Sequence, residues 1–299
     1  MKLNSPFLSF VLFLISGFGV FGQTAQKPLF TFGVMTDVQY CDCPTEGTRH
    51  YRSSLRKLNE AVQTFNQKNV AFVVHLGDFI DRDVRSFDTL HVLTKPLKRP
   101  LYHVLGNHEF AVQPEEIGKV PTVLGMKNRF YSFVKNRWRF IVLDGNDLSL
   151  YGNPKGSENY QTATGFLQQL KARNASNAQP WNGGLSEKQL RWLRNELDAA
   201  AKNGDNVLVF CHMPLMPDKD PHLLWNHAAV KTLLESYPNV RAYFNGHAHQ
   251  PSYSVQKNIH YITFRGMVEE EENGFAIVEV YPNQVKVDGY GAEIDRVLN

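Results

Sequence analysis

The sequence predicts an α/β protein whose sheet is covered by helices on both faces. Three observations support this fold class. Short apolar runs rich in β-branched residues recur along the chain, amphipathic helical patterns separate several of them, and two alternating runs near the C-terminus resemble a hairpin. Because neither an internal repeat nor a low-complexity linker divides the chain, we expect one domain over residues 23–299.

The expected strands are short apolar runs bounded by polar or turn-forming residues. They cover residues 29–35, 71–76, 101–105, 138–144, 206–212, 240–246 and 259–264. Two further runs, 275–281 and 284–290, alternate apolar and polar residues on either side of Pro282-Asn283. Since that dipeptide is typical of a tight turn, the two runs are expected to pair as a terminal hairpin.

Three segments between these strands have the apolar spacing of an amphipathic helix. The first is 53–67, where four apolar side chains fall on one face. The second, 185–202, is the strongest case because Ser186 and Gln189 form the pattern of a capping box. The third is 222–237, which a proline terminates.

The composition is that of a globular protein without a strong charge bias. Of 299 residues, 42% are hydrophobic and 20% are charged, and the formal net charge is +3. Without a Lys/Arg-rich run, nucleic acid and anionic membranes are poor candidate partners, and no feature indicates an oligomeric state. Residues 145–184, rich in Asn, Gly and Ser, are interpreted as a loop-rich insertion within the domain. The acidic run 269–272 is interpreted as a solvated loop in preference to a cation site.

Residues 1–22 have the pattern of a secretory signal peptide. Lys2 precedes an apolar stretch that ends in small residues, and a polar segment follows. The alternatives are an uncleaved signal anchor and an N-terminal core helix. However, the stretch is short for a membrane span and contains Gly17, Gly19 and Gly22. The sequence therefore predicts cleavage near Gly22 and export, periplasmic or secreted, without a stable membrane anchor.

Three cysteines follow the predicted cleavage point: Cys41, Cys43 and Cys211. A disulfide framework would need an even number and a wider spacing than the single residue between Cys41 and Cys43. We therefore expect free or partly buried thiols, and a fold that does not depend on disulfides.

Side chains with metal-binding chemistry follow five of the predicted strands. The set comprises Asp37 and Gln39, Asp78, Asn107 and His108, His212, and His247 and His249. None of these residues indicates a metal site by itself, because an Asp after a strand is usually a turn or cap residue and a lone His is usually structural. In α/β sheets, however, ligands bind beyond the carboxyl ends of the strands, where these residues would converge. Five such strand ends together predict a metal site.

The order of these motifs resembles that of the calcineurin-like metallophosphoesterases: Asp-x-Gln, Gly-Asp, Gly-Asn-His-Glu, His and Gly-His-x-His. Within this superfamily the chain is similar to the manganese-dependent ADP-ribose/CDP-alcohol diphosphatases. That similarity rests on TDVQY at 36–40, GTRHYRSSL at 47–55, LDGNDLS at 143–149, NGGLSEKQLRWL at 182–193 and LLWNHAAV at 223–230. The resemblance extends from about residue 29 to the C-terminus. It implies a four-layer α/β/β/α sandwich with a dinuclear metal site at the C-terminal ends of the strands.

The resemblance also implies a role for each matching residue. One divalent ion would be held by Asp37, Gln39, Asp78 and His249, and the other by Asp78, Asn107, His212 and His247. Two ions bridged in this way clamp the attacking and leaving oxygens and activate a bridging hydroxide. His108 would stabilise the phosphoryl oxygens or protonate the leaving group, and Glu109 would orient its neighbours. Arg49 and Leu185 match family positions near the substrate.

The implied reaction is hydrolysis of the phosphoanhydride bond in ADP-ribose, CDP-alcohols or related nucleotide diphosphates. The alternatives are hydrolysis of phosphodiesters or phosphomonoesters, and a non-catalytic scaffold, which the complete ligand set argues against. Purple acid phosphatases, a neighbouring family, have a Tyr ligand where this chain has Asp81. The carbonyl oxygen of Gln39, in place of an imidazole, makes one metal site harder and favours Mn²⁺ over zinc, with iron as a further candidate.

Overall fold

The structure is a computed structural model that describes residues 1, 3 and 27–299. The predicted signal peptide, residues 1–22, therefore lies outside the described residues except at two isolated positions. In the described part of the chain, no helix combines the length and the apolar character needed to cross a membrane.

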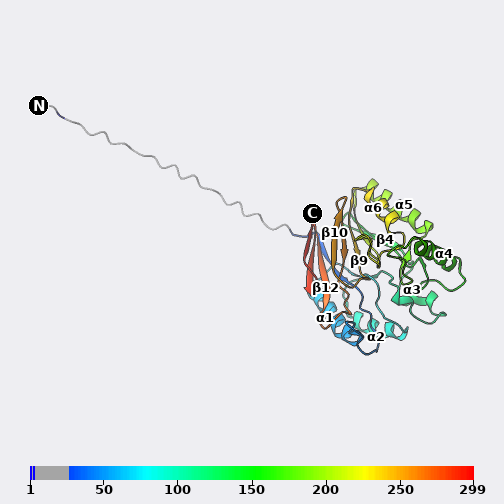
Figure 1. Ribbon diagram of the computed structural model, residues 1–299. Helices are drawn as coiled ribbons and strands as arrows, with labels where there is room; N and C mark the ends of the chain where they lie inside the picture. The colour runs from blue at the N-terminus through cyan, green and yellow to red at the C-terminus, as the bar shows by residue number, and fades with distance from the viewer. Residues whose placement is uncertain (2, 4–26) are drawn as a thin grey trace.

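Two six-stranded sheets form the centre of the molecule (Figure 1). The first has the order β14 (Arg296–Leu298), β13 (Val285–Gly291), β12 (Gly274–Val280), β1 (Phe30–Met35), β2 (Val73–His75) and β3 (Leu101–His103). The second has the order β10 (Ser252–Gln256), β11 (Ile259–Thr263), β9 (Val240–Asn245), β8 (Asn206–Phe210), β5 (Trp138–Val142) and β4 (Tyr131–Lys135). A short pair, β6 (Leu148–Ser149) and β7 (Gly183–Gly184), lies outside both sheets.

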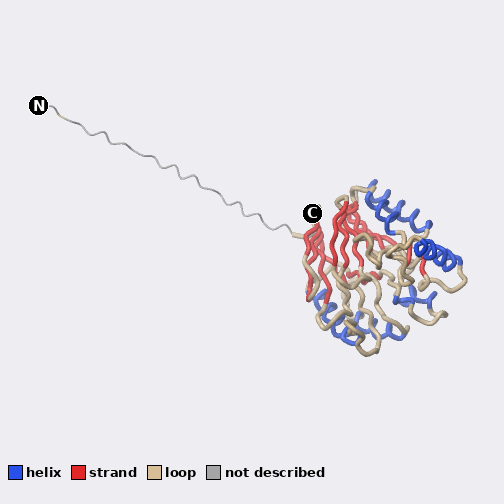
Figure 2. The backbone as a smooth tube through the Cα atoms, in the orientation of Figure 1, coloured by secondary structure: helices blue, strands red, loops and turns tan. Residues whose placement is uncertain are grey.

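Helices cover the outer faces of the two sheets, and Figure 2 shows them in separate groups with the strands between. The α-helices are α1 (Ser54–Gln67), α2 (Arg85–Thr94), α3 (Val120–Val123), α4 (Glu158–Ala172), α5 (Glu187–Asn203) and α6 (His227–Glu235). Three short 3₁₀ turns are η1 (Tyr51–Ser53), η2 (His108–Phe110) and η3 (Ile117–Lys119). The first sheet packs against α1 and α2, and the second packs against α5 and α6.

The layers follow from the alternation of side chains along each strand. On β1, Phe32 and Val34 enter a core between the two sheets, where Phe32 meets Phe140 and Phe210 at ring distances of 5.7 and 6.1 Å. Met35, on the opposite face, packs in the core beneath α1. Because both faces of both sheets are buried in this way, the predicted four-layer α/β/β/α sandwich is confirmed.

Some elements differ from the expectation. The edge strands β4, β10 and β14 and the helix α4 were not predicted, and α4 lies inside the segment 145–184 that we interpreted as loop-rich. This helix begins at Ser157, whose hydroxyl accepts a hydrogen bond from the Tyr160 amide at 3.2 Å. The apolar stripe of α4 is short (Ala163, Leu167 and Leu170), which explains why composition obscured it.

The N-terminus of α5 forms only half of the predicted capping box. The Ser186 hydroxyl accepts from the Gln189 amide at 3.2 Å, as expected. The Gln189 side chain does not return to Ser186. It is buried and bonds both backbone groups of Asp144, while the Asp147 carboxylate accepts from the Ser186 amide at 3.0 Å. The contact between Gln189 and the Asp144 backbone therefore replaces the expected contact between Gln189 and the Ser186 amide.

The prediction of free thiols at Cys41 and Cys43 is wrong, because the structure joins the two residues in a disulfide. The chain bends at Asp42, which brings the two Cα atoms to 5.2 Å, within the range that a disulfide requires. Cys211 is free and buried, as expected.

Candidate metal centre

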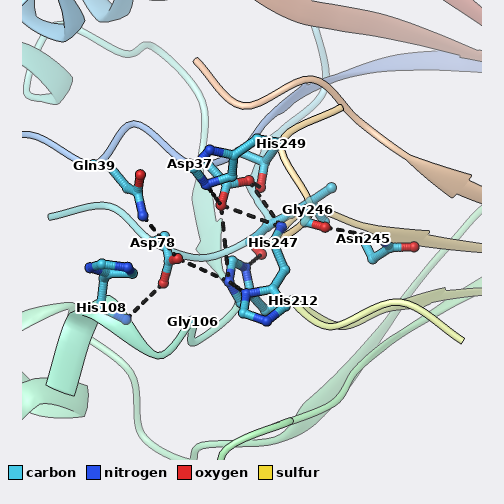
Figure 3. Close-up of polar contacts among 12 residues, drawn as sticks. Asp37, Gln39, Asp78, Gly106, His108, His212, Asn245, Gly246, His247 and His249 are labelled. Atoms are coloured by element: carbon cyan, nitrogen blue, oxygen red, sulfur yellow. Dashed lines mark hydrogen bonds and ion pairs between the residues drawn. The ribbon is translucent and has the colours of Figure 1, made fainter. Parts of the chain in front are cut away.

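The strand ends converge at the seam between the two sheets. β1, β2 and β3 run parallel in one sheet, and β8 and β9 run parallel in the other. The loops that follow them carry Asp37, Asp78, Asn107, His212 and His247. Figure 3 shows side chains from both sheets pointing toward one another. Residues that are up to 210 positions apart in sequence are thus in hydrogen-bonding contact.

Two carboxylates lie at the centre of this cluster. Asp78 Oδ2 is 3.1 Å from His212 Nε2 and 3.3 Å from the Gln39 amide nitrogen. Asp37 Oδ1 is 3.3 Å from His249 Nε2. Asp78, His212 and His247 each offer a ligand atom, and these atoms lie within 4.8 Å of one another. The arrangement matches a metal site in which Asp78 is central.

Two buried oxygens test whether a metal fits. Gln39 Oε1 and Asn107 Oδ1 have no hydrogen-bond partner, although both atoms are inaccessible to solvent. An unpaired buried amide oxygen costs free energy, so such atoms are rare unless something binds them. Both residues are predicted ligands, Gln39 of one ion and Asn107 of the other. Their unpaired oxygens therefore fit a site for hard divalent cations, which prefer oxygen ligands.

Each histidine is held through one ring nitrogen, which leaves the other for the cluster. His212 Nδ1 lies 2.9 Å from the Leu76 carbonyl, and His249 Nδ1 lies 2.6 Å from Glu269 Oε1. His247 is held from the opposite nitrogen, because its Nε2 lies 2.8 Å from Asn182 Oδ1. Outer contacts of this kind fix the tautomer and the ring orientation of metal-binding histidines.

The backbone at the cluster is strained in a consistent way. Five of the seven predicted ligand residues have a positive φ, with values of 49° for Asp37, 41° for Gln39, 58° for Asp78, 68° for His247 and 59° for His249. Non-glycine residues seldom adopt this region, and the strain persists where surrounding contacts enforce it. Here the backbone amide of Gln39 donates to the Asp78 carbonyl at 2.9 Å, and the backbone amide of Asp37 donates to the Gly77 carbonyl at 3.0 Å.

Two glycines let the loops approach one another. A Cβ on Gly106 would collide with the Asp78 carboxylate, and a Cβ on Gly246 would collide with the Asp37 carboxylate and Thr36. Gly106, before Asn107, and Gly246, before His247, are therefore required by close packing of the metal-binding loops.

The charged and titratable side chains of the cluster shift one another's pKa values. Burial opposes ionisation of Asp78, but His212 and His108 hold its pKa well below the ordinary value. Against the effect of burial, Asp78 raises the pKa of His212 to about 9, and Asp37 raises the pKa of His249 to about 9. Burial and the nearby His212 lower the pKa of His247. A cation bound by His212 or His249 would compete with the protons on these rings, because metal ligands must be deprotonated.

His108, the predicted catalytic residue, stands beside the cluster with its side chain 24% exposed. Its backbone amide donates to Asp78 Oδ1 at 2.8 Å, and its ring Nδ1 lies 2.9 Å from the Asp81 carbonyl and 3.3 Å from the Asp81 carboxylate. Nδ1 therefore donates to Asp81, which leaves Nε2 free. Glu109 accepts from the amides of Asp78, Phe79 and Gly106 at 2.6–2.9 Å, so it orients two of the loops as expected.

A cavity of about 380 Å³ opens over the cluster. Its lining includes the predicted residues Gln39, Arg49, Asp78, Asn107, His108, His247 and His249. Ala111, Tyr151, Trp181 and His222 also line the cavity, and Tyr151 and Trp181 are each 37% exposed. Leu185 does not line this cavity. It is 1% exposed and packs in the core between α5 and the second sheet.

A comparison with protein families now identifies the fold and the cluster. The model of the calcineurin-like phosphoesterases matches residues 30–251, more than half of the chain. The chain belongs to this family. The match begins at β1 and ends just after His249, so it includes every residue of the metal cluster.

Individual proteins of known sequence and structure show which members of the family this phosphoesterase is similar to. It is 32% identical to a manganese-dependent ADP-ribose/CDP-alcohol diphosphatase of Xenopus tropicalis, over 91% of this chain and 95% of the relative. It is 31% identical to one of Arabidopsis thaliana, over 90% of this chain and 96% of the relative. The crystal structure of a dimetal phosphatase from Danio rerio superposes with a TM-score of 0.82 at 30% identity, covering 91% and 99% of the two chains. These similarities identify the phosphoesterase as a metal-dependent hydrolase.

Three residues that hold the site were missed as site residues by sequence analysis. They are Asp81 beside His108, Asn182 beside His247 and Glu269 beside His249. The interpretation of 269–272 as a solvated loop is wrong at its first residue, because Glu269 is buried and the hydrogen bond from His249 lowers its pKa to about 2. An acidic run gives no sign that one member turns inward. Asn182 lies in the quoted motif at 182–193, and Asp81 occupies the position of the Tyr ligand in purple acid phosphatases, so both could have been found there.

Proposed function

We propose that this phosphoesterase hydrolyses the phosphoanhydride bond of nucleotide diphosphates such as ADP-ribose and CDP-alcohols, with two Mn²⁺ ions as cofactors. The observation that carries this proposal is the pair of unpaired buried oxygens, Gln39 Oε1 and Asn107 Oδ1, on the floor of a cavity that Arg49 and two aromatic side chains also line. The names of the relatives, at about 30% identity over nearly the whole chain, support the same substrate class.

The donor set favours manganese. Asp37, Gln39, Asp78 and His249 offer mostly oxygen atoms to one ion, and Asp78, Asn107, His212 and His247 offer two oxygens and two nitrogens to the other. Such ions, when bound, activate water and neutralise charge on a diphosphate. An amide oxygen at Gln39 suits a harder metal than the thiolate- and imidazole-rich sites that zinc prefers.

The protein's own groups complete the site. Because Nδ1 donates to Asp81, Nε2 of His108 carries a hydrogen only in the imidazolium form, and in that form it can donate a hydrogen bond to a phosphoryl oxygen or a proton to the leaving group. The leaving group in a diphosphate is itself a phosphate, a weak base, so little proton transfer is needed. Arg49 lies on the same cavity wall, where its guanidinium can form paired hydrogen bonds with the second phosphate.

The rim of the cavity fits a nucleoside. Tyr151 and Trp181 retain more than a third of their surface in solvent, whereas most aromatic side chains in the described part of the chain are buried. Exposed rings beside a phosphate site offer a stacking surface for a base, and stacking of this kind contributes about 1–3 kcal/mol. A phosphomonoesterase has no need of such a surface, so the rim favours nucleotide diphosphates over small monoesters.

The test is a substrate screen in Mn²⁺ with wild-type protein and Asp78→Asn. ADP-ribose, CDP-choline, UDP-sugars, bis-p-nitrophenyl phosphate and p-nitrophenyl phosphate are compared at equal concentration. We expect the nucleotide diphosphates to give the highest kcat/KM, with AMP or CMP as the product, and we expect Asp78→Asn or EDTA to abolish it. Hydrolysis of p-nitrophenyl phosphate alone would overturn the substrate class, and full activity in Asp78→Asn would overturn the metal mechanism.

We also propose that the protein is exported. The signal-peptide pattern of residues 1–22 supports this, and the Cys41–Cys43 disulfide is consistent with an oxidising compartment. Mass spectrometry of the protein from fractionated cells tests the proposal. A mature N-terminus near residue 23 in the exported fraction is expected, and an intact N-terminus in the cytosol would contradict it.

A further inference from the structure

The segment 266–270 links the metal cluster to the substrate side of the cavity. Its backbone contacts both loops of one predicted metal position: the Gly266 amide donates to the His249 carbonyl at 2.9 Å, and the Val268 amide donates to the Asp37 carbonyl at 2.9 Å. Its one buried carboxylate, that of Glu269, bonds the His249 ring at 2.6 Å. The segment therefore holds two of the four predicted ligands of this ion.

The same segment also forms hydrogen bonds with the backbone of the residues on both sides of Arg49. The Glu270 amide donates to the Thr48 carbonyl at 2.7 Å, and the His50 amide donates to the Val268 carbonyl at 2.8 Å. Arg49 itself pairs with Glu269 as an isolated antiparallel bridge. The amide and carbonyl of Arg49 bond Glu46 at 3.0 and 3.1 Å within the same turn, so segment 266–270 fixes the position of this whole turn relative to the metal cluster.

One buried lysine holds the segment in place. Lys57, on α1, is fully buried and directs its ammonium to three carbonyls of the segment: those of Met267 at 2.8 Å, Glu269 at 2.9 Å and Glu270 at 2.5 Å. An ammonium has three donors, so all of them are used within four consecutive residues. Burial lowers the pKa of Lys57 to about 8, which leaves the side chain charged at neutral pH.

We propose that Lys57 and Glu269 are positioning residues that set both the metal affinity at the Asp37/Gln39/His249 position and the placement of Arg49. Glu269 fixes His249 so that Nε2 faces Asp37, and Lys57 fixes the segment that carries Glu269. Neither side chain lines the cavity, so neither touches substrate. The inference rests on the proposed metal-dependent function, and it adds a link between one metal position and substrate binding that runs through α1.

The first test measures Mn²⁺ binding to the metal-free protein by calorimetry, which does not depend on turnover. Glu269→Gln keeps the size of the side chain but removes its charge, so one of two Mn²⁺ binding steps should weaken by about 10- to 100-fold. The step that depends on Asp78, His212 and His247 should stay unchanged. Glu272→Gln, an exposed residue of the same acidic run, is the matched control and should bind as wild type.

The second test uses Lys57→Met, which preserves the aliphatic stem and removes the three hydrogen bonds. We expect the same Mn²⁺ step to weaken and, at saturating Mn²⁺, the KM for ADP-ribose to rise by about tenfold with a smaller change in kcat, since Arg49 loses its place. Lys68→Met, exposed at the end of the same helix, should change neither value. Circular dichroism shows whether the variants fold, and Glu269→Gln decides the question if Lys57→Met does not.

Two outcomes would overturn the proposal. One is a folded Lys57→Met or Glu269→Gln protein with both Mn²⁺ steps and the KM of wild type, because a purely structural role predicts lower stability alone. The other is an equal weakening of both steps, which would show a general loss of the site. If wild type binds two Mn²⁺ ions but cleaves no nucleotide diphosphate, the proposed substrate is wrong, and the calorimetry still decides the role of these residues.

Discussion

Gln39 shows how a single residue can define a site. Its amide nitrogen donates to Asp78 Oδ2 at 3.3 Å, which turns its oxygen away from Asp78 and leaves that oxygen unpaired. A histidine here could present only a nitrogen. The unpaired oxygen fits the predicted role of Gln39 as an oxygen ligand, which stays a prediction, and each neighbouring predicted ligand is buried.

Replacement of Gln39 tests its effect on metal choice. Gln39→His should raise the affinity for Zn²⁺ relative to Mn²⁺ by about tenfold or more, because imidazole is the softer ligand. Competition of the two metals for the metal-free protein, followed by metal analysis, measures this ratio. Gln161→His on the exposed face of α4 controls for added surface histidine. An unaltered metal ratio and substrate profile would count against our interpretation of Gln39.

Whether the function of a residue could be predicted depended on its place in the sequence. The seven predicted ligand residues follow strands in short polar motifs, and the structure brings them together. Glu269 and Lys57 could not be found in this way. Their function depends on a loop folding back onto α1, and neither an acidic run nor a helical lysine carries a local signal of burial. Leu185 matched a family position, yet in this chain it belongs to the core.

At the scale of elements, burial separated the predicted strands from the missed ones. β1, β2, β8 and β9 are almost wholly buried and appear as continuous apolar runs. The edge strand β10 has the burial of a half-exposed surface, and its sequence, SYSVQ, contains few apolar residues. Edge strands of this kind are defined by their neighbours, so a single sequence predicts them poorly.

The contact between β1 and α1 depends on a residue without a side chain. A Cβ on Gly33 would lie 2.7 Å from the ring of Phe65 on α1. Gly33→Ala should therefore lower the free energy of unfolding by about 1–3 kcal/mol through overpacking. Urea unfolding measures this change, and Phe65→Leu in the same chain should recover part of it.

The matched control for this variant is Gly165 on α4, where an added Cβ would meet no atom within 4 Å. Gly165→Ala should stabilise the protein by about 0.5–1 kcal/mol, because alanine favours the helix. If both alanine variants changed stability in the same direction, the close approach of α1 to β1 would not be the cause.

At the scale of the molecule, the site exists because two sheets meet. One sheet supplies Asp37, Gln39, Asp78 and Asn107, and the other supplies His212, His247 and His249. The aromatic core between the sheets, with Phe32, Phe140 and Phe210, holds these two sets of loops at a fixed separation. The sequence predicted the strands and their polar ends. The division into two sheets came from the family resemblance, and the strand order was not predicted, because both depend on contacts between distant segments.

The central claim is that loops of both sheets hold two Mn²⁺ ions that share Asp78. The most direct measurement is electron paramagnetic resonance of the metal-free protein titrated with Mn²⁺. We predict two ions per chain and the spectrum of an exchange-coupled pair, since bridged ions in such sites are about 3.5–4 Å apart. Asp78→Asn should abolish the coupling. One isolated Mn²⁺ ion per chain in wild type, or a coupled pair that persists in Asp78→Asn, would contradict the account.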